Sequence, residues 1–330
     1  MTREELKRIT LKVIKKPRQK ARLTLDENEW RFTLNITPSS LRFAGFYMDY
    51  ISGTVMVDWG DGTIGPATFS YQHLTHTYAE PGIYHVSIKG KIGRIQGDGL
   101  ATLTSVDSPL PKTMQTSTTS GIEYSFNGAS NLLDLPERLF ANCSSALSAY
   151  GCFEGCSSLL MLPEDVLKYS PNITNADRLV SGCRNFKEIS EEIFRNCPKL
   201  TQVQSAFRYT DITEIPDELF SSNPLLENVL SAFYGCTQLK SIPSGLFSHT
   251  PALVTLDSTF AGCTSLTAIP GDLFHAVADG AYFGSCFEGC TGITGPVPRL
   301  WETHPNSYGY RCFRECVNAS NYSSIPSNWR

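Results

Sequence analysis

The stretch SAFYGCTQLKSIPSGLF, residues 231–247, decides the fold, because variants of it recur through the last two thirds of the chain. The copies are variants of the pattern F-x-G-C-x-x-L-x-x-I-P-x-x-L-F, and the hydrophobic step, followed by proline in seven of the eight copies, returns every 26 to 28 residues. The eight steps are Leu135-Pro136, Leu162-Pro163, Ile189-Ser190, Ile215-Pro216, Ile242-Pro243, Ile269-Pro270, Val297-Pro298 and Ile325-Pro326. A period of this size predicts a solenoid, in which each coil buries its apolar side against its neighbours.

The residues of one copy predict its local structure. Phe233 is expected to face the interior, and Gly235 permits a tight corner where a Cβ would clash. Pro243 ends a short extended segment and suits the first position of a helical turn, on which Leu246 and Phe247 share one face. Acidic residues follow the proline in copies such as PERLF and PDELF, where a helix dipole is positive. We therefore expect a short helical turn in every coil.

The repeat resembles a known class of leucine-rich repeat. AFYGCTQLKSIP, residues 232–243, is similar to the A-F-x-x-C-x-x-L-x-x-I-x-I-P core of the BspA-like type, over about 200 residues of the chain. The repeat is several residues longer than is usual for that class, and residues 207–216 lack one residue and the Gly-Cys pair. The resemblance implies a solenoid that binds proteins, often on host or bacterial cell surfaces.

Residues 22–98 alternate apolar and polar side chains over several short runs, which predicts a small β-sandwich. Within them, VDWGDGT at 57–63 and HTYAEPGIYHVSI at 76–88 resemble the turn and strand of a PKD domain. This family is an immunoglobulin-like sandwich, and the resemblance implies a spacer or adhesion module.

The expected fold is therefore mostly β with short helical turns. It has three parts: a basic leader at 1–21, a PKD-like β-sandwich at 22–98, and a leucine-rich-repeat solenoid of about eight coils at 99–330. Nine of the first 22 residues are Lys or Arg, against two Glu, and no apolar secretory core is present. The leader is either a solvated tail or an anchor that docks on a larger acidic assembly.

Six cysteines occupy one repeat position and are expected to form a ladder of buried thiols: Cys156, Cys183, Cys236, Cys263, Cys290 and Cys316. Three more, Cys152, Cys286 and Cys312, precede a ladder cysteine by four residues, so a disulfide remains an alternative. A zinc site is not indicated, because the CxxxC pairs have no histidine beside them.

Two further sets of residues are candidates for a site. Asp58 and Asp61 flank a Trp-Gly step and are weak candidates for calcium; the alternative is that they bind backbone amides of the turn. Tyr150, Tyr209, Tyr282, Tyr308 and Tyr310 fall near coil corners or the C-terminal end. Tyrosine is enriched at binding hot spots, so they form a possible binding surface. The alternative for them is partial burial between coils.

The sequence contains no phosphate loop, nucleophile elbow or HExxH motif, so no catalytic residue, metal or cofactor is predicted. A net charge of -4 argues against nucleic acid, and no apolar run is long enough to span a membrane. We therefore expect a non-enzymatic protein that binds a protein or cell-surface ligand through the solenoid. The first hypothesis is a virion component, such as a phage fibre or capsid decoration. The alternative is a bacterial surface adhesin whose signal peptide has been trimmed, located at the cell surface.

Overall fold

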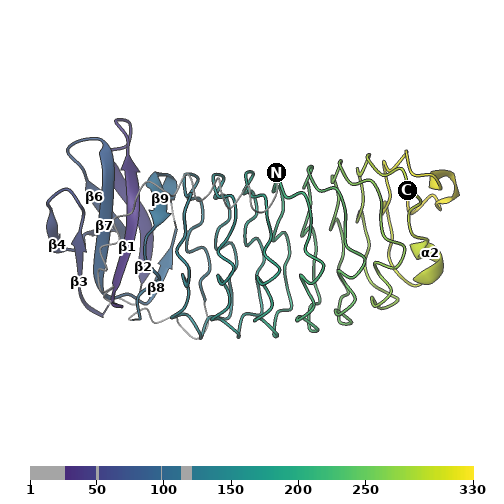
Figure 1. The fold of residues 1–330 in the computed structure, drawn as a ribbon, viewed down its shortest axis with the longest axis horizontal. Coiled ribbons are helices and arrows are strands. Elements are labelled where there is room, and N and C mark those ends of the chain that lie inside the picture. Colours follow the sequence, from purple (N-terminus) through teal and green to yellow (C-terminus); the bar gives the residue numbers. More distant parts are fainter. Residues whose placement is uncertain (1–26, 50–51, 98, 113–120) are drawn as a thin grey trace.

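The computed structural model describes residues 27–49, 52–97, 99–112 and 121–330. The basic leader predicted at residues 1–21 lies outside the described residues. Figure 1 shows two sheets at one end of the molecule and a row of stacked loops that extends away from them.

Two antiparallel sheets form the part nearest the N-terminus. The first has the strand order β4-β3-β7-β1-β9 and the second the order β5-β6-β2-β8. The strands are β1 (Glu29–Ile36), β2 (Arg42–Asp49), β3 (Ser52–Asp58), β4 (Ile64–Pro66), β5 (Phe69–Ser70), β6 (His73–Thr77), β7 (Gly82–Lys91), β8 (Arg94–Gln96) and β9 (Leu103–Val106). The period-2 alternation in the sequence corresponds to β1, β3 and β7, which are neighbours in one sheet.

Aromatic side chains fill the space between the two sheets. Trp30 and Phe32 of β1 lie 4.7 Å and 5.3 Å from the ring of Phe46 in β2. All three are fully buried. Phe46 also contacts Phe126 of the first repeat, with ring centroids 6.3 Å apart. One continuous core therefore runs from the sheets into the repeats.

The first sheet is bonded directly to the first repeat. β9 pairs with β1, so residues beyond the predicted boundary at 98/99 still belong to the first sheet. The next contact is a parallel bridge from Ser105 in β9 to Asp134 in the first repeat. The amide of Val106 also donates to the carbonyl of Asp134 at 3.0 Å. The sheet edge is thereby covered by the first repeat, which protects it from pairing with another chain.

Each repeat is bonded to the next through alternate residues of its first segment. The amides of Val229, Ser231, Phe233 and Gly235 donate to carbonyls of the following repeat at 2.8–2.9 Å. The amides between them instead close turns within the repeat, as when Tyr234 N–H donates to the Ser231 carbonyl at 3.1 Å. Because the amides bond alternately to the next repeat and within their own repeat, the backbone N–H groups of this segment find acceptors.

The segment after each proline is a run of turns and not a helix. In residues 216–223, the bonds join Leu219 to Pro216, Ser221 to Glu218, and Asn223 to Phe220, each an i to i−3 bond. An α-helix requires i to i−4 bonds at every residue. A proline followed by acidic residues and then Leu-Phe is compatible with overlapping turns as well as with a helical turn. The sequence pattern therefore does not distinguish a helical turn from a run of turns.

The fold-class prediction was therefore wrong. Among the described residues, helix is confined to the four-residue α2 (Leu300–Thr303) and the short 3-10 segments η1 (Leu100–Thr102) and η2 (Tyr322–Ser324). In the described part of the chain, strands are confined to residues 29–106, and the β-bridges between repeats are isolated ones. The helix-containing leucine-rich-repeat solenoid of about eight coils is replaced by sheets followed by stacked turns.

Phenylalanine rings hold the stack together along its axis. Phe233 lies parallel to Phe207 and Phe260, with ring centroids 5.5 Å and 5.4 Å away. Phe260 continues the column to Phe287 at 5.3 Å, and the rings are fully buried. At the far end Trp329 covers Phe313, the last ring of the column, at 6.4 Å. No repeat buries its own phenylalanine alone, so the stability of each depends on its neighbours.

Candidate binding face of the repeats

Two backbone positions with left-handed conformation shape one edge of every repeat. In the repeat quoted above they are Ser231, with φ 54°, and Gly235, with φ 69°. The pair recurs at Ser258 and Gly262 one repeat later. Between the two positions, Phe233 points into the core and Tyr234 lies half-buried at the surface. The edge therefore presents a fixed set of side-chain positions, one set for each repeat.

The repeat that contains Arg208 departs from this pattern. Tyr209, with φ 56°, stands where most repeats have glycine, and Thr210 stands where most have cysteine. A non-glycine residue in this conformation costs about 1–2 kcal/mol. Gly235 in the next repeat leaves the space that the ring needs, because a Cβ there would lie 2.5 Å from Cδ1 of Tyr209. Glu315 holds the same position in the last repeat with φ 66°, so the feature that makes Tyr209 the first candidate is its ring, for which Gly235 leaves the space.

Arg208 lies between two tyrosine rings. Its guanidinium carbon is 4.7 Å from the ring centroid of Tyr209 and 4.8 Å from that of Tyr234. The two rings are nearly perpendicular and 5.4 Å apart, and Arg208 Nη2 donates to the Tyr209 hydroxyl at 3.3 Å. Arg208 Nε is buried without a hydrogen-bond acceptor among the described residues. The nearby phenol of Tyr209, followed by burial, raises the pKa of Tyr234, while Arg208 opposes this.

Two similar clusters lie on the same edge. Toward the sheets, the rings of Tyr124 and Tyr150 are 5.1 Å apart, and Arg178 lies 5.7 Å from Tyr150. Near the C-terminus, Tyr308 lies 6.2 Å from Tyr282 and 6.3 Å from Tyr310, which carries Arg311 at 4.9 Å.

Backbone bonds between repeats place the three clusters in register. Four backbone amides donate to backbone carbonyls of the next repeat at 2.8–2.9 Å. The pairs are Tyr124 with Tyr150, Arg178 with Gln204, Ser205 with Leu230, and Ser285 with Tyr310. We call the resulting surface the tyrosine–arginine face. Its residues are Tyr124, Tyr150, Arg178, Arg208, Tyr209, Tyr234, Tyr282, Tyr308, Tyr310 and Arg311.

The structure exposes four of the five tyrosines that the sequence singled out. Tyr209 is 43% exposed, Tyr282 54%, Tyr308 52% and Tyr310 47%, whereas Tyr150 is half-buried. Sequence reasoning missed Arg208 and Tyr234. The signal that pointed to them was the departure from the Gly-Cys pattern at residues 207–210.

The ladder cysteines hold repeats together through their thiols. Cys236 Sγ donates to the Phe207 carbonyl at 3.1 Å, one repeat back. The other five do the same, at 3.0–3.3 Å: Cys156, Cys183, Cys263, Cys290 and Cys316. All eleven cysteines, including Cys152, Cys286 and Cys312, are buried free thiols.

Burial also sets the reactivity of these thiols. It raises the pKa of Cys143 to about 12 and that of Cys236 to about 11. A thiol must ionise to act as a nucleophile, so these groups are poorly suited to catalysis at neutral pH.

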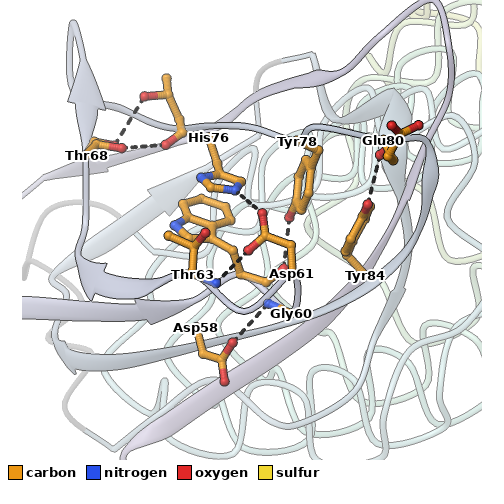
Figure 2. A network of polar contacts seen from close by, with 11 residues as sticks. Asp58, Gly60, Asp61, Thr63, Thr68, His76, Tyr78, Glu80 and Tyr84 are labelled. Carbon is orange, nitrogen blue, oxygen red and sulfur yellow. Dashed lines mark hydrogen bonds and ion pairs between the residues drawn. The ribbon is translucent and has the colours of Figure 1, made fainter.

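The two aspartates of the predicted turn bind backbone amides. Gly60 N–H donates to Asp58 and Thr63 N–H donates to Asp61, each at 2.9 Å. Asp61 also accepts a 2.7 Å bond from His76, whose ring stacks on Trp59 at 4.5 Å; Figure 2 shows this network. Burial would raise the pKa of Asp61, but the bonds from His76 and Thr63 outweigh it and lower the pKa. These contacts are those of a stabilised turn.

Two features are absent from the described residues. No group of three or more His, Cys, Asp or Glu in that part of the chain is arranged to hold a metal ion. None of its helices has the length and apolar character needed to cross a membrane.

No family model matches the chain, and no curated protein matches it either. Two similar solved structures are of the Toll–Spatzle complex, a molecular hub in Drosophila development and innate immunity. The glycosylated form is 16% identical to this chain, with a TM-score of 0.30. The match covers 67% of this chain and 33% of the chain in that structure. The second structure is 17% identical to this chain, with a TM-score of 0.20. The match covers 52% of this chain and 30% of the chain in that structure. This chain therefore spans about a third of their length.

Proposed function

We propose that this chain is a non-enzymatic binding protein whose tyrosine–arginine face binds another protein. The observation that supports this most is the Arg208 cluster. Tyr209 keeps an unfavourable backbone conformation, and its ring and that of Tyr234 enclose one guanidinium at the surface. Tyrosine and arginine supply most hot-spot energy at protein interfaces, because they combine large contact area with hydrogen-bonding groups.

The arrangement of the face favours a macromolecular ligand over a small one. Its three clusters are spread over many repeats and held in register by the backbone. A small molecule is usually bound in a concave site that buries most of its surface. A row of exposed and half-buried rings and cations along one edge instead suits an extended protein surface, with Arg208 and its two tyrosines as the central anchor.

The setting that we propose is a virion, with the chain as a fibre or capsid decoration that presents this face to a cell. The resemblances to PKD and BspA-like modules support a display role, and the net charge of -4 argues against nucleic acid as the ligand. Mass spectrometry of purified particles tests the setting. Finding the chain in particles in stoichiometric amounts is the expected result. Finding it only in bacterial outer-surface fractions would replace the virion with the adhesin.

The binding role is tested separately on intact cells. The full chain, fluorescently labelled, should be retained by target cells, and protease treatment of those cells should remove the retention. Arg208→Ala with Tyr234→Ala should weaken retention at least tenfold, since hot-spot truncations cost about 2 kcal/mol or more. The control is Lys240→Ala with Thr264→Ala, two exposed residues outside the face. Equal retention of both double variants would refute the proposed face.

A further inference from the structure

A groove with acidic walls lies at the proline corner of the first two repeats. Its volume is about 480 Å³. Leu133, which is 50% exposed, and Met161 contribute apolar surface. The carboxylates that line it are Asp134, Glu137, Glu164 and Asp165, and the described lining contains no Lys, Arg or His. The groove therefore combines apolar surface with a concentration of negative charge.

The same surface continues over the next two repeats. A second hollow of about 280 Å³ is lined by Glu188, Glu191, Glu214 and Asp217, again with no basic residue in its described lining. A parallel bridge between Met161 and Glu188 joins the two hollows. We call these eight carboxylates the acidic strip. Among the cations nearby, Lys187 lies 2.6 Å from Asp211 and Arg195 lies 2.6 Å from Glu192, while the guanidinium of Arg138 lies 5.5 Å from the ring centroid of Tyr169.

The chain itself contains a segment of matching chemistry. Residues 1–22 carry nine Lys or Arg against two Glu, and Ile9, Leu11, Val13 and Ile14 lie in a stretch with basic residues on both sides and Lys12 within it. Apolar side chains of this segment suit the apolar part of the groove, while its cations suit the carboxylates around them. We propose that the basic leader of this chain docks in its own acidic groove.

The point at which the leader joins the described chain makes this contact possible within one molecule. The carbonyl of Glu27 accepts a bond from Lys112 N–H at 2.9 Å, and the two side chains form an ion pair. Two residues earlier, Leu110 N–H donates to the Leu139 carbonyl at 2.9 Å, in the same turn as Glu137 of the groove. Glu27, the first described residue after the leader, thus lies beside the first repeat.

The length of the leader is also sufficient. An extended chain spans about 3.3–3.6 Å per residue, so the residues between Lys12 and Glu27 reach up to about 50 Å. Four stacked repeats span only about 15 Å at the spacing of paired strands. A tethered segment also acts at an effective concentration of roughly millimolar, which favours its own groove over that of a second molecule.

Carbodiimide cross-linking of the full chain, read by mass spectrometry, tests the inference. The reagent joins a lysine to a carboxylate that it contacts. We expect links from Lys7, Lys12, Lys15 and Lys16 to groove carboxylates, and their loss in 1 M salt, where the Debye length is about 3 Å. In an equal mixture of ¹⁴N- and ¹⁵N-labelled protein, linked peptides should carry matching labels. Mixed labels on the same peptides would mean that a second copy fills the groove, and would overturn docking within one chain.

A pair of charge-reversed variants separates docking from general attraction. Glu137→Lys with Glu164→Lys should reduce the links at least tenfold and speed trypsin cleavage within residues 1–22 at least tenfold. Glu227→Lys with Asp272→Lys changes net charge equally at exposed sites outside the strip and should alter neither. Equal effects of the two variants, or no effect of either, would overturn the proposal. The tyrosine–arginine face is untouched in both, so its binding is tested independently.

Discussion

Replacing Gly235 with Ala tests how the tyrosine–arginine face is built. Gly235 has φ +69°, and an added Cβ would lie 2.5 Å and 2.6 Å from ring atoms of Tyr209. Gly262→Ala is the matched control. Gly262 has φ +74°, and its Cβ would meet nothing nearer than the Gly235 Cα at 3.6 Å, an ordinary contact. Both variants place a side chain in the left-handed region, at about 1–2 kcal/mol each.

Only Gly235→Ala must also move the ring of Tyr209. Displacing that ring removes its contact with Arg208, worth about 0.5–1 kcal/mol at an exposed site. It also removes the edge contact with Tyr234, worth about 0.5–1.5 kcal/mol. We therefore expect Gly235→Ala to be less stable than Gly262→Ala by about 1–2.5 kcal/mol, the sum of the two contacts.

Urea unfolding followed by circular dichroism measures the two free energies of unfolding. Tyr209→Gly supplies the decisive background, because it removes the ring that the new methyl group would strike. In that background the difference between the two alanine variants should disappear, as in a double-mutant cycle. A difference that persists there, or equal losses in the original chain, would refute this reasoning.

Further predictions concern the core, the thiols and the turn. Phe260→Ala should lower the free energy of unfolding by about 3–5 kcal/mol, because the ring is buried between two others. Tyr282→Ala, at an exposed ring, should change it by no more than about 0.5 kcal/mol. Urea titrations measure both values, and equal losses would contradict the ring column. Native protein at pH 8 should react with no thiol reagent, and unfolded protein with eleven equivalents; fast labelling of the native form would contradict the burial. Because burial raises the pKa of Cys143 from 9.0 to about 12, the contribution of this thiol to stability should be constant below pH 9 and be lost as pH rises toward 12, so the fall in stability over that range should be smaller in Cys143→Ala. The pKa of Asp61 is lowered, so the stability lost in Asp61→Asn at pH 7 should shrink as pH falls below 3.8; thermal melts at several pH values test the sign.

Part of the fold could be predicted because it depends on local alternation and period. β1, β3 and β7 follow from apolar residues at every second position, and the buried cysteines and phenylalanines follow from their fixed place in the repeat. The helical turns could not be settled this way. Proline followed by Leu-Phe suits either a helix or overlapping turns, and the bonds between repeats that favour turns join residues about 26 positions apart.

The candidate site could likewise be predicted only in part from the sequence. Exposed tyrosines were found from their positions in the repeat, but Arg208 was not, because its tyrosine partners are Tyr209 beside it and Tyr234 in the next repeat. Only the register of the stack brings the second ring to the guanidinium. The anomaly at residues 207–210 was visible in the sequence, while its meaning required the space left by Gly235.

Distances between spin labels test the stacking of the repeats most directly. Asn175, Gln202, Asn228, Thr255, Tyr282 and Tyr308 follow one another through single parallel bridges, one step per repeat. Labels on introduced cysteines at 175 and 255 should lie three steps apart, as should labels at 228 and 308, at about 15 Å between backbones in both cases. Labels at 175 and 308, five steps apart, should be separated by about 24 Å. Separations that agree with this count of steps are the predicted result, and separations that do not increase with the number of steps would contradict the account.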